Sequence, residues 1–144
     1  MKNDELVQFA QKAFIICDNK ILIIQKSSKD LFQPDKWDVP GGRKQEDETL
    51  DEQIIREVKE EVGIDVVPER VFDMWQFSLN KNGKKTTVVA VARFCKMKRN
   101  NIKITEDIIA IYKWAEINES LLAYDFISPI KQIIENLVKG KYNL

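Results

Sequence analysis

Histidine is absent from this sequence of 144 residues, and cysteine occurs only twice. Without imidazole, any general base, metal ligand or partner of a nucleophile must come chiefly from carboxylates. Oxygen ligands of this kind select Mg²⁺, Mn²⁺ or Ca²⁺ over zinc. Cys17 and Cys95 lie inside apolar runs at no metal-ligand spacing, and we expect both to be reduced residues of the core.

Long apolar runs are also missing. No run approaches the roughly 18 apolar residues of a membrane-spanning helix, and the first ten residues lack the apolar segment of a signal peptide. The composition, 44% hydrophobic and 32% charged, is typical of a soluble globular protein. We therefore expect a cytoplasmic protein with no membrane partner, forming a single domain over residues 1–144.

The net charge is zero, but the charges are unevenly distributed. Gly42–Ile64 holds eight acidic and four basic residues, whereas Lys81–Lys103 holds eight basic residues and no acid. The basic region could bind nucleic acid or a polyphosphate. It could equally be a solvated hairpin whose charges protect a sheet edge from aggregation. No aromatic residues are interleaved to suit nucleic acid, so the second interpretation is favoured and a nucleic-acid partner is the weaker one.

Runs rich in β-branched and aromatic residues predict strands joined by short turns. The first two runs are separated by Asp18-Asn19-Lys20 and form a hairpin, and a later hairpin turns at Asn82-Gly83. A polar loop, Ser27–Lys36, precedes a short extended piece that ends in a turn at Pro40-Gly41-Gly42. The predicted strands are Lys12–Cys17, Ile21–Lys26, Trp37–Val39, Ile64–Val67, Val71–Leu79, Thr86–Cys95 and Ile108–Ile117, with a break near Pro68.

One amphipathic helix carries clear start and stop signals. Thr49 and Glu52 form a capping box, which predicts a helix that begins near Leu50, and Gly63 suits its C-terminal end. The apolar stripe of this helix consists of Leu50, Ile54, Val58 and Val62, joined by Ile55. Two further helical pieces are predicted at Glu119–Ala123 and Pro129–Val138. A mixed β-sheet flanked by helices on both faces would bury these apolar surfaces.

Three carboxylates crowd into one sector of this helix. Glu57, Glu60 and Glu61 span about 100° of arc, with Glu61 nearest the core side. Like charges at such spacings destabilise an exposed helix by roughly 0.2–0.5 kcal/mol per pair. Arg56 has a rigid fork that suits the orientation of a carboxylate. Three acids lie within its reach, Glu48, Glu52 and Glu60. The concentrated negative charge indicates that a cation binds here.

The spacing of these residues resembles the Nudix box, the motif of the Nudix hydrolase family. That motif reads G, five residues, E, seven residues, REU, one residue, EE, one residue, GU, where U is aliphatic. Every position is filled here, by Gly42, Glu48, Arg56, Glu57, Val58, Glu60, Glu61, Gly63 and Ile64. The preceding run, Trp37 to Gly42, is similar to the one that usually enters the box. The element order outside the box also resembles the α/β/α sandwich of that family.

The resemblance implies a metal-dependent pyrophosphohydrolase. Such an enzyme cleaves a diphosphate linkage in a nucleoside di- or triphosphate or a nucleotide derivative, with Mg²⁺ or Mn²⁺ as cofactor. Carried over by position, Glu57, Glu60 and Glu61 would bind the metal, and the Gly41 carbonyl would be a further ligand. Glu57, or an acid on a later loop, would act as general base.

The other box positions are assigned by the same resemblance. Arg56 would orient the catalytic glutamates, and Glu48 would be its salt-bridge partner. Gly42 and Gly63 would be required for the backbone conformation and would take no part in the reaction. Family members often carry a further catalytic acid on a loop before a late strand, and here Glu106 is the first candidate and Asp107 the second.

The substrate is left open by the sequence. Five aromatics could stack a base, namely Phe32, Trp75, Phe77, Tyr124 and Phe126, although aromatics at alternating strand positions are more often core. The markers of ADP-ribose, dinucleoside polyphosphate and coenzyme A subfamilies are missing, which favours a nucleoside triphosphate pyrophosphatase that sanitises the nucleotide pool. The alternatives are an RNA 5′-end pyrophosphohydrolase and a non-catalytic nucleotide-sensing module. Exposed strand edges would allow a homodimer.

Overall fold

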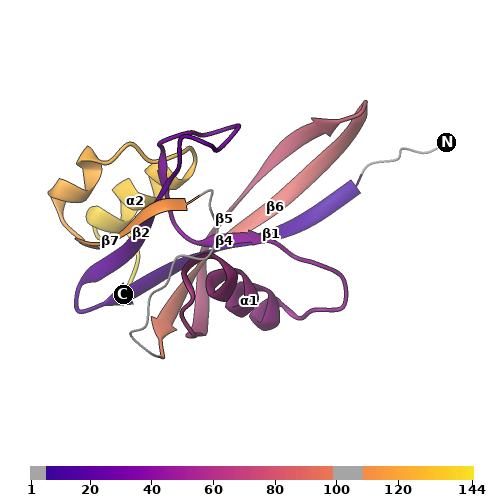
Figure 1. Ribbon diagram of the computed structural model, residues 1–144. Coiled ribbons are helices and arrows are strands. Elements are labelled where there is room, and N and C mark those ends of the chain that lie inside the picture. Colours follow the sequence, from indigo (N-terminus) through magenta and orange to yellow (C-terminus); the bar gives the residue numbers. More distant parts are fainter. Residues whose placement is uncertain (1–5, 99–108) are drawn as a thin grey trace.

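A computed structural model describes residues 6–98 and 109–144, and these form a mixed sheet with helices on both faces (Figure 1). The strands are β1 (Leu6–Cys17), β2 (Lys20–Lys26), β3 (Trp37–Asp38), β4 (Gly41–Arg43), β5 (Val66–Lys81), β6 (Lys84–Met97) and β7 (Ile109–Glu116). The helical elements are α1 (Leu50–Val62), the 3-10 helix η1 (Glu119–Ala123) and α2 (Ile130–Val138). The predicted α/β/α sandwich is confirmed.

Strand β1 holds the sheet together because it pairs with three other strands. Its N-terminal part runs parallel to β6 and antiparallel to β4, and its last residues pair antiparallel with β2. The strand order is β3-β2-β1-β6-β5, with β7 paired to β2. Strand β5 therefore lies at one edge. As Figure 1 shows, the β5–β6 hairpin and the start of β1 extend together beyond the helices.

Both predicted hairpins are confirmed, and each turns on two residues with positive φ. Asp18 and Asn19 have φ of 52° and 59°, and Asn82 and Gly83 have φ of 52° and 77°. Two consecutive residues of this conformation form the turn whose twist matches that of the flanking strands. Asparagine, aspartate and glycine adopt it at the lowest cost, which is why the sequence signal was reliable.

Three strand predictions were wrong at their boundaries. Strand β1 begins at Leu6 rather than Lys12, because a parallel partner in β6 extends the pairing. The expected turn at Pro40–Gly42 leads instead directly into β4, which pairs with β1. The expected break near Pro68 is a register shift within one continuous strand, β5. Proline is tolerated there because β5 is an edge strand with an irregular register.

Two buried clusters lie on opposite faces of the sheet. The first joins α1 to the sheet through Ile54, Val58 and Val62, and the second joins α2 through Ile130, Ile134 and Leu137. Alternate residues of β1 serve the two clusters, with Ala13 and Ile15 on the α1 side and Phe14 on the α2 side. None of the described helices is long and apolar enough to cross a membrane.

Helix α1 has the predicted ends, but only part of its predicted apolar stripe is buried. The Thr49–Glu52 capping box is present, and Gly63 ends the helix at a φ of 75°. Leu50 and Ile55 are exposed, however, while Gln53 and Glu61 are buried. A polar side chain is buried at low cost only when it is hydrogen-bonded, and partners for both come from β1 and β4.

One of the two cysteine predictions was also wrong. Cys95 is buried in the α1-side cluster, but Cys17 is exposed at the end of β1. The strand reaches the surface where it enters the Asp18-Asn19 turn, and that removes Cys17 from the core. Both cysteines are free thiols, as expected.

Candidate active site

Strand β4 is held against helix α1 by a chain of buried amides. The Gln53 side chain donates to the Gly42 carbonyl at 2.7 Å and accepts a hydrogen bond from Gln11 of β1. The Gln11 amide also donates to the Leu50 carbonyl at 2.6 Å. Because buried amides must be satisfied, this chain fixes the distance between the glycine segment and the helix. The sequence did not reveal this part of the site.

Gly41 lies where no other residue fits. Its φ is 152°, and a Cβ added there would stand 2.2 Å from the Gln11 carbonyl oxygen. Its N–H donates to Glu61 Oε1 at 2.7 Å. The close approach of β4 to β1 therefore depends on glycine, and it brings a backbone donor to the most buried of the three glutamates.

Gly42 faces a second glutamate. A Cβ added to Gly42 would stand 2.5 Å from Glu57 Cδ and 2.6 Å from both carboxylate oxygens. Gly42 is not among the glycines with positive φ, so its backbone conformation does not by itself require glycine. The missing side chain instead leaves room for the Glu57 carboxylate over β4.

Arg56 connects the remaining acids of the site. Its guanidinium donates to both oxygens of Glu48 at 2.9 Å, to Glu57 at 3.1 Å and to Glu60 at 3.2 Å. It also donates to the Arg43 carbonyl of β4 at 3.3 Å. Of the three predicted partners, Glu48 and Glu60 are contacted. Glu52 instead bonds the backbone of Thr49 in the capping box.

The bidentate contact to Arg56, together with the Gln45 N–H, lowers the pKa of Glu48 to about 2. A carboxylate whose pKa is lowered in the folded state stabilises the fold at a pH above its ordinary pKa of about 4.5. That contribution is lost as the pH falls from about 4.5 towards 2.

We therefore expect Glu48→Gln to lower the stability at neutral pH and to do so less in acid. Urea unfolding of the wild type and the variant from pH 7 to pH 3 would measure this. The difference between their midpoints should narrow as the pH falls below 4.5, because Glu48 is then protonated in the unfolded wild type and must lose that proton on folding. A difference that stays constant over the whole range would contradict the assignment.

A group of charges around the buried Asp38 lies near Glu61 on β1, β2 and β3. Lys12 Nζ lies 2.9 Å from Asp38 Oδ2, and Lys26 Nζ lies 3.9 Å from the same oxygen. Burial acts to lower the pKa of Lys12, but Asp38, Glu61 and Glu57 together raise it. Lys12 is the one charged residue of β1, and that charge was the sequence signal for it.

Glu61 is only 5% exposed, and its burial raises its pKa to about 8. Lys12 and the Gly41 N–H act in the opposite direction but do not cancel the effect of burial. Perturbed carboxylates of this kind are concentrated at functional sites. A cation bound beside Glu61 would favour its ionised form and lower the cost of burying it.

The three glutamates lie in one region, but their carboxylates do not converge on one point. Glu61 turns to the Gly41 N–H, whereas Glu57 and Glu60 turn to Arg56. No three acidic, histidine or cysteine side chains among residues 6–98 and 109–144 are grouped closely enough to hold a metal ion. The donors are nevertheless all oxygens, the type that Mg²⁺ and Mn²⁺ prefer. The expected further acid, Glu106, and its neighbour Asp107 lie outside the described residues.

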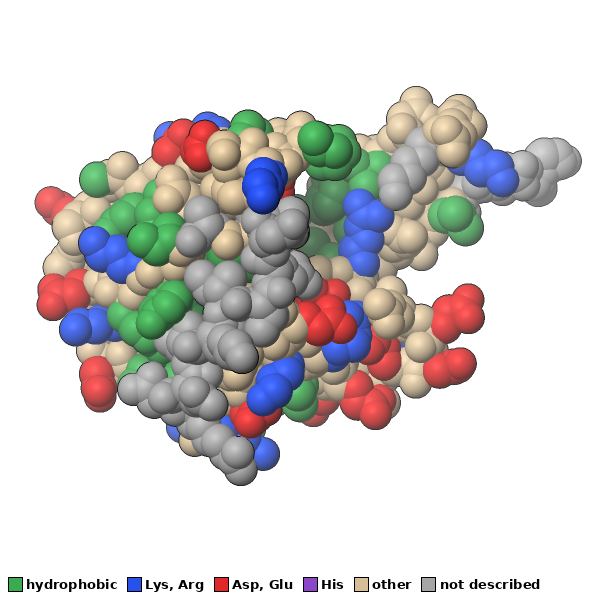
Figure 2. All heavy atoms as spheres, viewed as in Figure 1, with side chains coloured by type: hydrophobic (Ala, Val, Ile, Leu, Met, Phe, Trp, Pro, Cys, Tyr) green, Lys and Arg blue, Asp and Glu red, His purple; other side chains and the backbone are tan. Residues whose placement is uncertain are grey.

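The basic region does not form one continuous patch in its described part. Arg93 pairs with Asp51 at 2.6 Å and donates to the Glu69 carbonyl, and Lys96 pairs with Glu69 at 3.5 Å. These ion pairs fit the interpretation of a charged hairpin better than that of a nucleic-acid surface. Figure 2 shows acidic side chains gathered over α1 and the loop before it.

Comparison with known proteins identifies related sequences. Residues 9–137 match the family described as NUDIX domain. The chain is 32% identical over 125 residues to an 8-oxo-dGTP diphosphatase of Buchnera aphidicola, which covers 87% of this chain and 88% of that protein. It is 36% identical over 63 residues to an 8-oxo-dGTP diphosphatase of Proteus vulgaris, covering 42% of this chain and 55% of that protein.

Solved structures show the same fold. The MutT protein of Methanosarcina mazei Go1 superposes with a TM-score of 0.71 at 22% identity, covering 97% of this chain and 99% of the other. The ORF135 protein of E. coli superposes with a TM-score of 0.68 at 19% identity, covering 95% and 92%. At these identities the likeness concerns the fold alone.

Proposed function

The chain belongs to the NUDIX family of hydrolases, and from this premise we propose that its substrate is a nucleoside triphosphate, cleaved to a nucleoside monophosphate and pyrophosphate. The family and its 8-oxo-dGTP diphosphatase relatives make the chain a pyrophosphohydrolase that sanitises nucleotides. The observation that carries the residue assignment is the junction of β4 and α1. There Glu61 accepts a hydrogen bond from Gly41, Glu57 lies against Gly42, and Arg56 donates to Glu57 and Glu60.

We propose that Glu57, Glu60 and Glu61, with the Gly41 carbonyl, hold the divalent metal that NUDIX hydrolases generally use. Mg²⁺ or Mn²⁺ at this position would neutralise charge on the phosphate oxygens and make water more acidic. The all-oxygen donor set supports this choice of metal. Because Gly42 has no side chain, the Glu57 carboxylate can lie against β4, and this supports its placement in the metal site.

The protein groups then have distinct tasks. Glu57, or Glu106, would accept the proton of the attacking water. Arg56 would hold Glu57 and Glu60 in position, and Glu48 would fix the guanidinium from the other side. Lys12 would add positive charge near Glu57 and Glu61, where the phosphates bind.

A panel of substrates with Mg²⁺ and with Mn²⁺ tests the proposal. It should contain normal and oxidised nucleoside triphosphates, nucleotide sugars, ADP-ribose, dinucleoside polyphosphates and triphosphorylated RNA. We expect the highest kcat/KM with a nucleoside triphosphate, and 8-oxo-dGTP is the first candidate because both curated relatives are named for it. Preference for triphosphorylated RNA would instead support the RNA-end alternative. Tight binding without any hydrolysis would support a sensing module.

We also propose a homodimer formed along β5. This strand lies at one edge of the sheet, and its Val71 and Met74 are 50% and 63% exposed. A second copy paired edge to edge would cover both the backbone groups and these side chains. Sedimentation equilibrium distinguishes the dimer from a monomer.

A further inference from the structure

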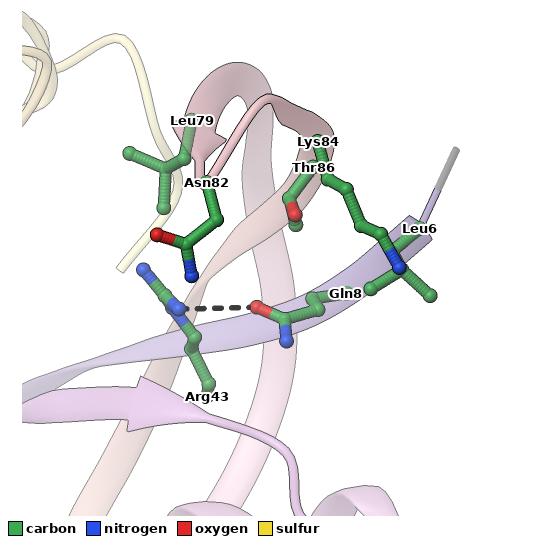
Figure 3. Close-up of a pocket in the computed structure, with 7 residues that line it drawn as sticks. All are labelled: Leu6, Gln8, Arg43, Leu79, Asn82, Lys84 and Thr86. Atoms are coloured by element: carbon green, nitrogen blue, oxygen red, sulfur yellow. Dashed lines mark hydrogen bonds between the residues drawn. The ribbon is translucent and has the colours of Figure 1, made fainter. Parts of the chain in front are cut away.

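A pocket of about 300 Å³ lies at the end of the sheet where the β5–β6 hairpin meets the start of β1 (Figure 3). Leu6 of β1 lines it. Lys12, the β1 residue that pairs with Gly41, lies six residues further along the strand, which corresponds to about 20 Å. A group bound in this pocket is therefore too far from the candidate metal ligands to take part in their reaction. The pocket is a separate place on the molecule.

Arg43 reaches this pocket from β4 and has no acidic partner among the described residues. It is only partly exposed, and its guanidinium donates to the neutral Gln8 Oε1 at 3.1 Å. Arg56 and Arg93, by contrast, each pair with a carboxylate. A guanidinium carries five N–H donors in a planar fork, so donors remain after the contact with Gln8. A partly buried guanidinium without a counter-charge favours an anionic ligand.

The other polar groups of the pocket can also donate hydrogen bonds. The Asn82 amide and the Lys84 ammonium are exposed, whereas Thr86 is only 6% exposed and its side chain lines the pocket. None of these three side chains donates to another described residue. Figure 3 shows the side chains of Gln8, Arg43 and Asn82 pointing toward one another. The lining residues include two cations and no acid, so the pocket is suited to an anion.

The chemistry of the lining favours a phosphate group that is joined to an organic group. A phosphate monoester carries roughly 1.5 to 2 negative charges at neutral pH and presents three acceptor oxygens, which match two cations and several neutral donors. The planar fork of an arginine binds such a group through two hydrogen bonds. Leu6 and Leu79 form the apolar part of the wall. Small-molecule sites combine apolar walls with a few convergent polar groups in this way.

We propose that this pocket is a second ligand site, which binds a small phosphate monoester. Arg43 and Lys84 pair with the charge of the phosphate, and the neutral donors of the pocket bind its oxygens. The organic group contacts Leu6 and Leu79. Binding here requires no divalent metal, because the cations of the site are side chains. The site does not depend on the proposed reaction, so a chain that hydrolysed no nucleotide would still bind the ester.

Three probes test the ligand chemistry. Phenyl phosphate carries both a phosphate and an apolar ring, inorganic phosphate lacks the ring, and phenol lacks the phosphate. In titrations of the full chain followed by amide NMR spectra, phenyl phosphate should shift the signals of Gln8, Arg43 and Thr86. It should bind about tenfold more tightly than inorganic phosphate, because the ring covers apolar surface. Phenol should not bind.

The same titrations can contradict the proposal. The affinity for phenyl phosphate should be equal with Mg²⁺ and in a chelator, and a requirement for Mg²⁺ would place the phosphate in the metal site instead. Phenol that bound as tightly as phenyl phosphate would show that the pocket takes apolar ligands and would overturn the anion site. Equal affinities for inorganic phosphate and phenyl phosphate would contradict the contact with the two leucines.

Two substitutions test the cations. Arg43→Met removes the guanidinium and keeps the carbonyl to which Arg56 donates, and Lys84→Met removes an exposed ammonium. Each should weaken the binding of phenyl phosphate about tenfold, since a charge-assisted hydrogen bond is lost. Lys85→Met makes the same change of charge one residue along and outside the pocket, and it should leave the affinity unchanged. Glu60→Gln, in the candidate active site, should also leave it unchanged. Equal weakening by Lys84→Met and Lys85→Met, or a loss of binding in Glu60→Gln, would overturn the second site.

Discussion

Glu60→Gln is expected to lower kcat by on the order of 100-fold or more with any good substrate. The substitution removes one negative charge from the proposed metal site and keeps the size of the side chain. Its effect on stability should be small, because the Glu60 side chain is 48% exposed and its ion pair with Arg56 is solvated. Steady-state kinetics at saturating Mg²⁺, with urea unfolding in parallel, measures both quantities.

Glu46→Gln provides the matched control. This substitution is chemically the same as Glu60→Gln, but Glu46 lies in the exposed loop before α1, away from the Arg56 contacts. We expect its kcat to equal that of the wild type. Undiminished turnover in Glu60→Gln would remove this residue from the metal site, and an equal loss in both variants would show that general negative charge, rather than a specific ligand, matters.

Gly42→Ala should separate activity from stability. The added Cβ would stand 2.5 Å from the Glu57 carboxyl carbon, and the flexible end of that side chain can move away. The free energy of unfolding should therefore change by less than about 1 kcal/mol. Turnover should fall by about 100-fold, because a catalytic group displaced by about an ångström loses that much. Kinetics and urea unfolding of the same preparation measure the two effects.

Gly140→Ala should show the opposite pattern. A Cβ at Gly140 meets no atom within 4 Å, but the residue has a φ of 73°. An alanine in this conformation costs about 1 kcal/mol of stability, and it lies after α2, away from β4 and α1. Turnover per folded molecule should be unchanged. If Gly42→Ala instead lost stability and activity in proportion, its effect would be one of folding and not of Glu57 placement.

The parts of the fold that the sequence predicted well depend on local interactions. Helix α1 begins and ends where Thr49, Glu52 and Gly63 indicate, since capping involves neighbours in the chain. The two tight hairpins follow from Asp18-Asn19 and Asn82-Gly83 for the same reason. The pairing of Arg56 with Glu48 could be anticipated because Glu48 lies only eight residues before Arg56, just ahead of α1.

Other features of the site depend on contacts between distant segments and could not be predicted. The burial of Gln53 follows from its bonds to Gly42 and Gln11, which lie on two other elements. The Lys12–Asp38 pair joins β1 to β3. The pocket drawn in Figure 3 forms because β1, β4, β5 and β6 are paired in one register, which brings Leu6, Arg43 and Thr86 together. Periodicity in a single strand contains no information about its partners.

Product analysis with 8-oxo-dGTP tests the central claim most directly. The purified protein with Mg²⁺ should release one 8-oxo-dGMP and one pyrophosphate per substrate consumed, and a chelator should stop the reaction until Mg²⁺ is added again. Chromatographic separation of the nucleotides, with a separate assay for pyrophosphate and phosphate, measures these products. Release of a nucleoside diphosphate and phosphate, or turnover that persists in the chelator, would contradict the carboxylate metal site and the diphosphate cleavage assigned to it.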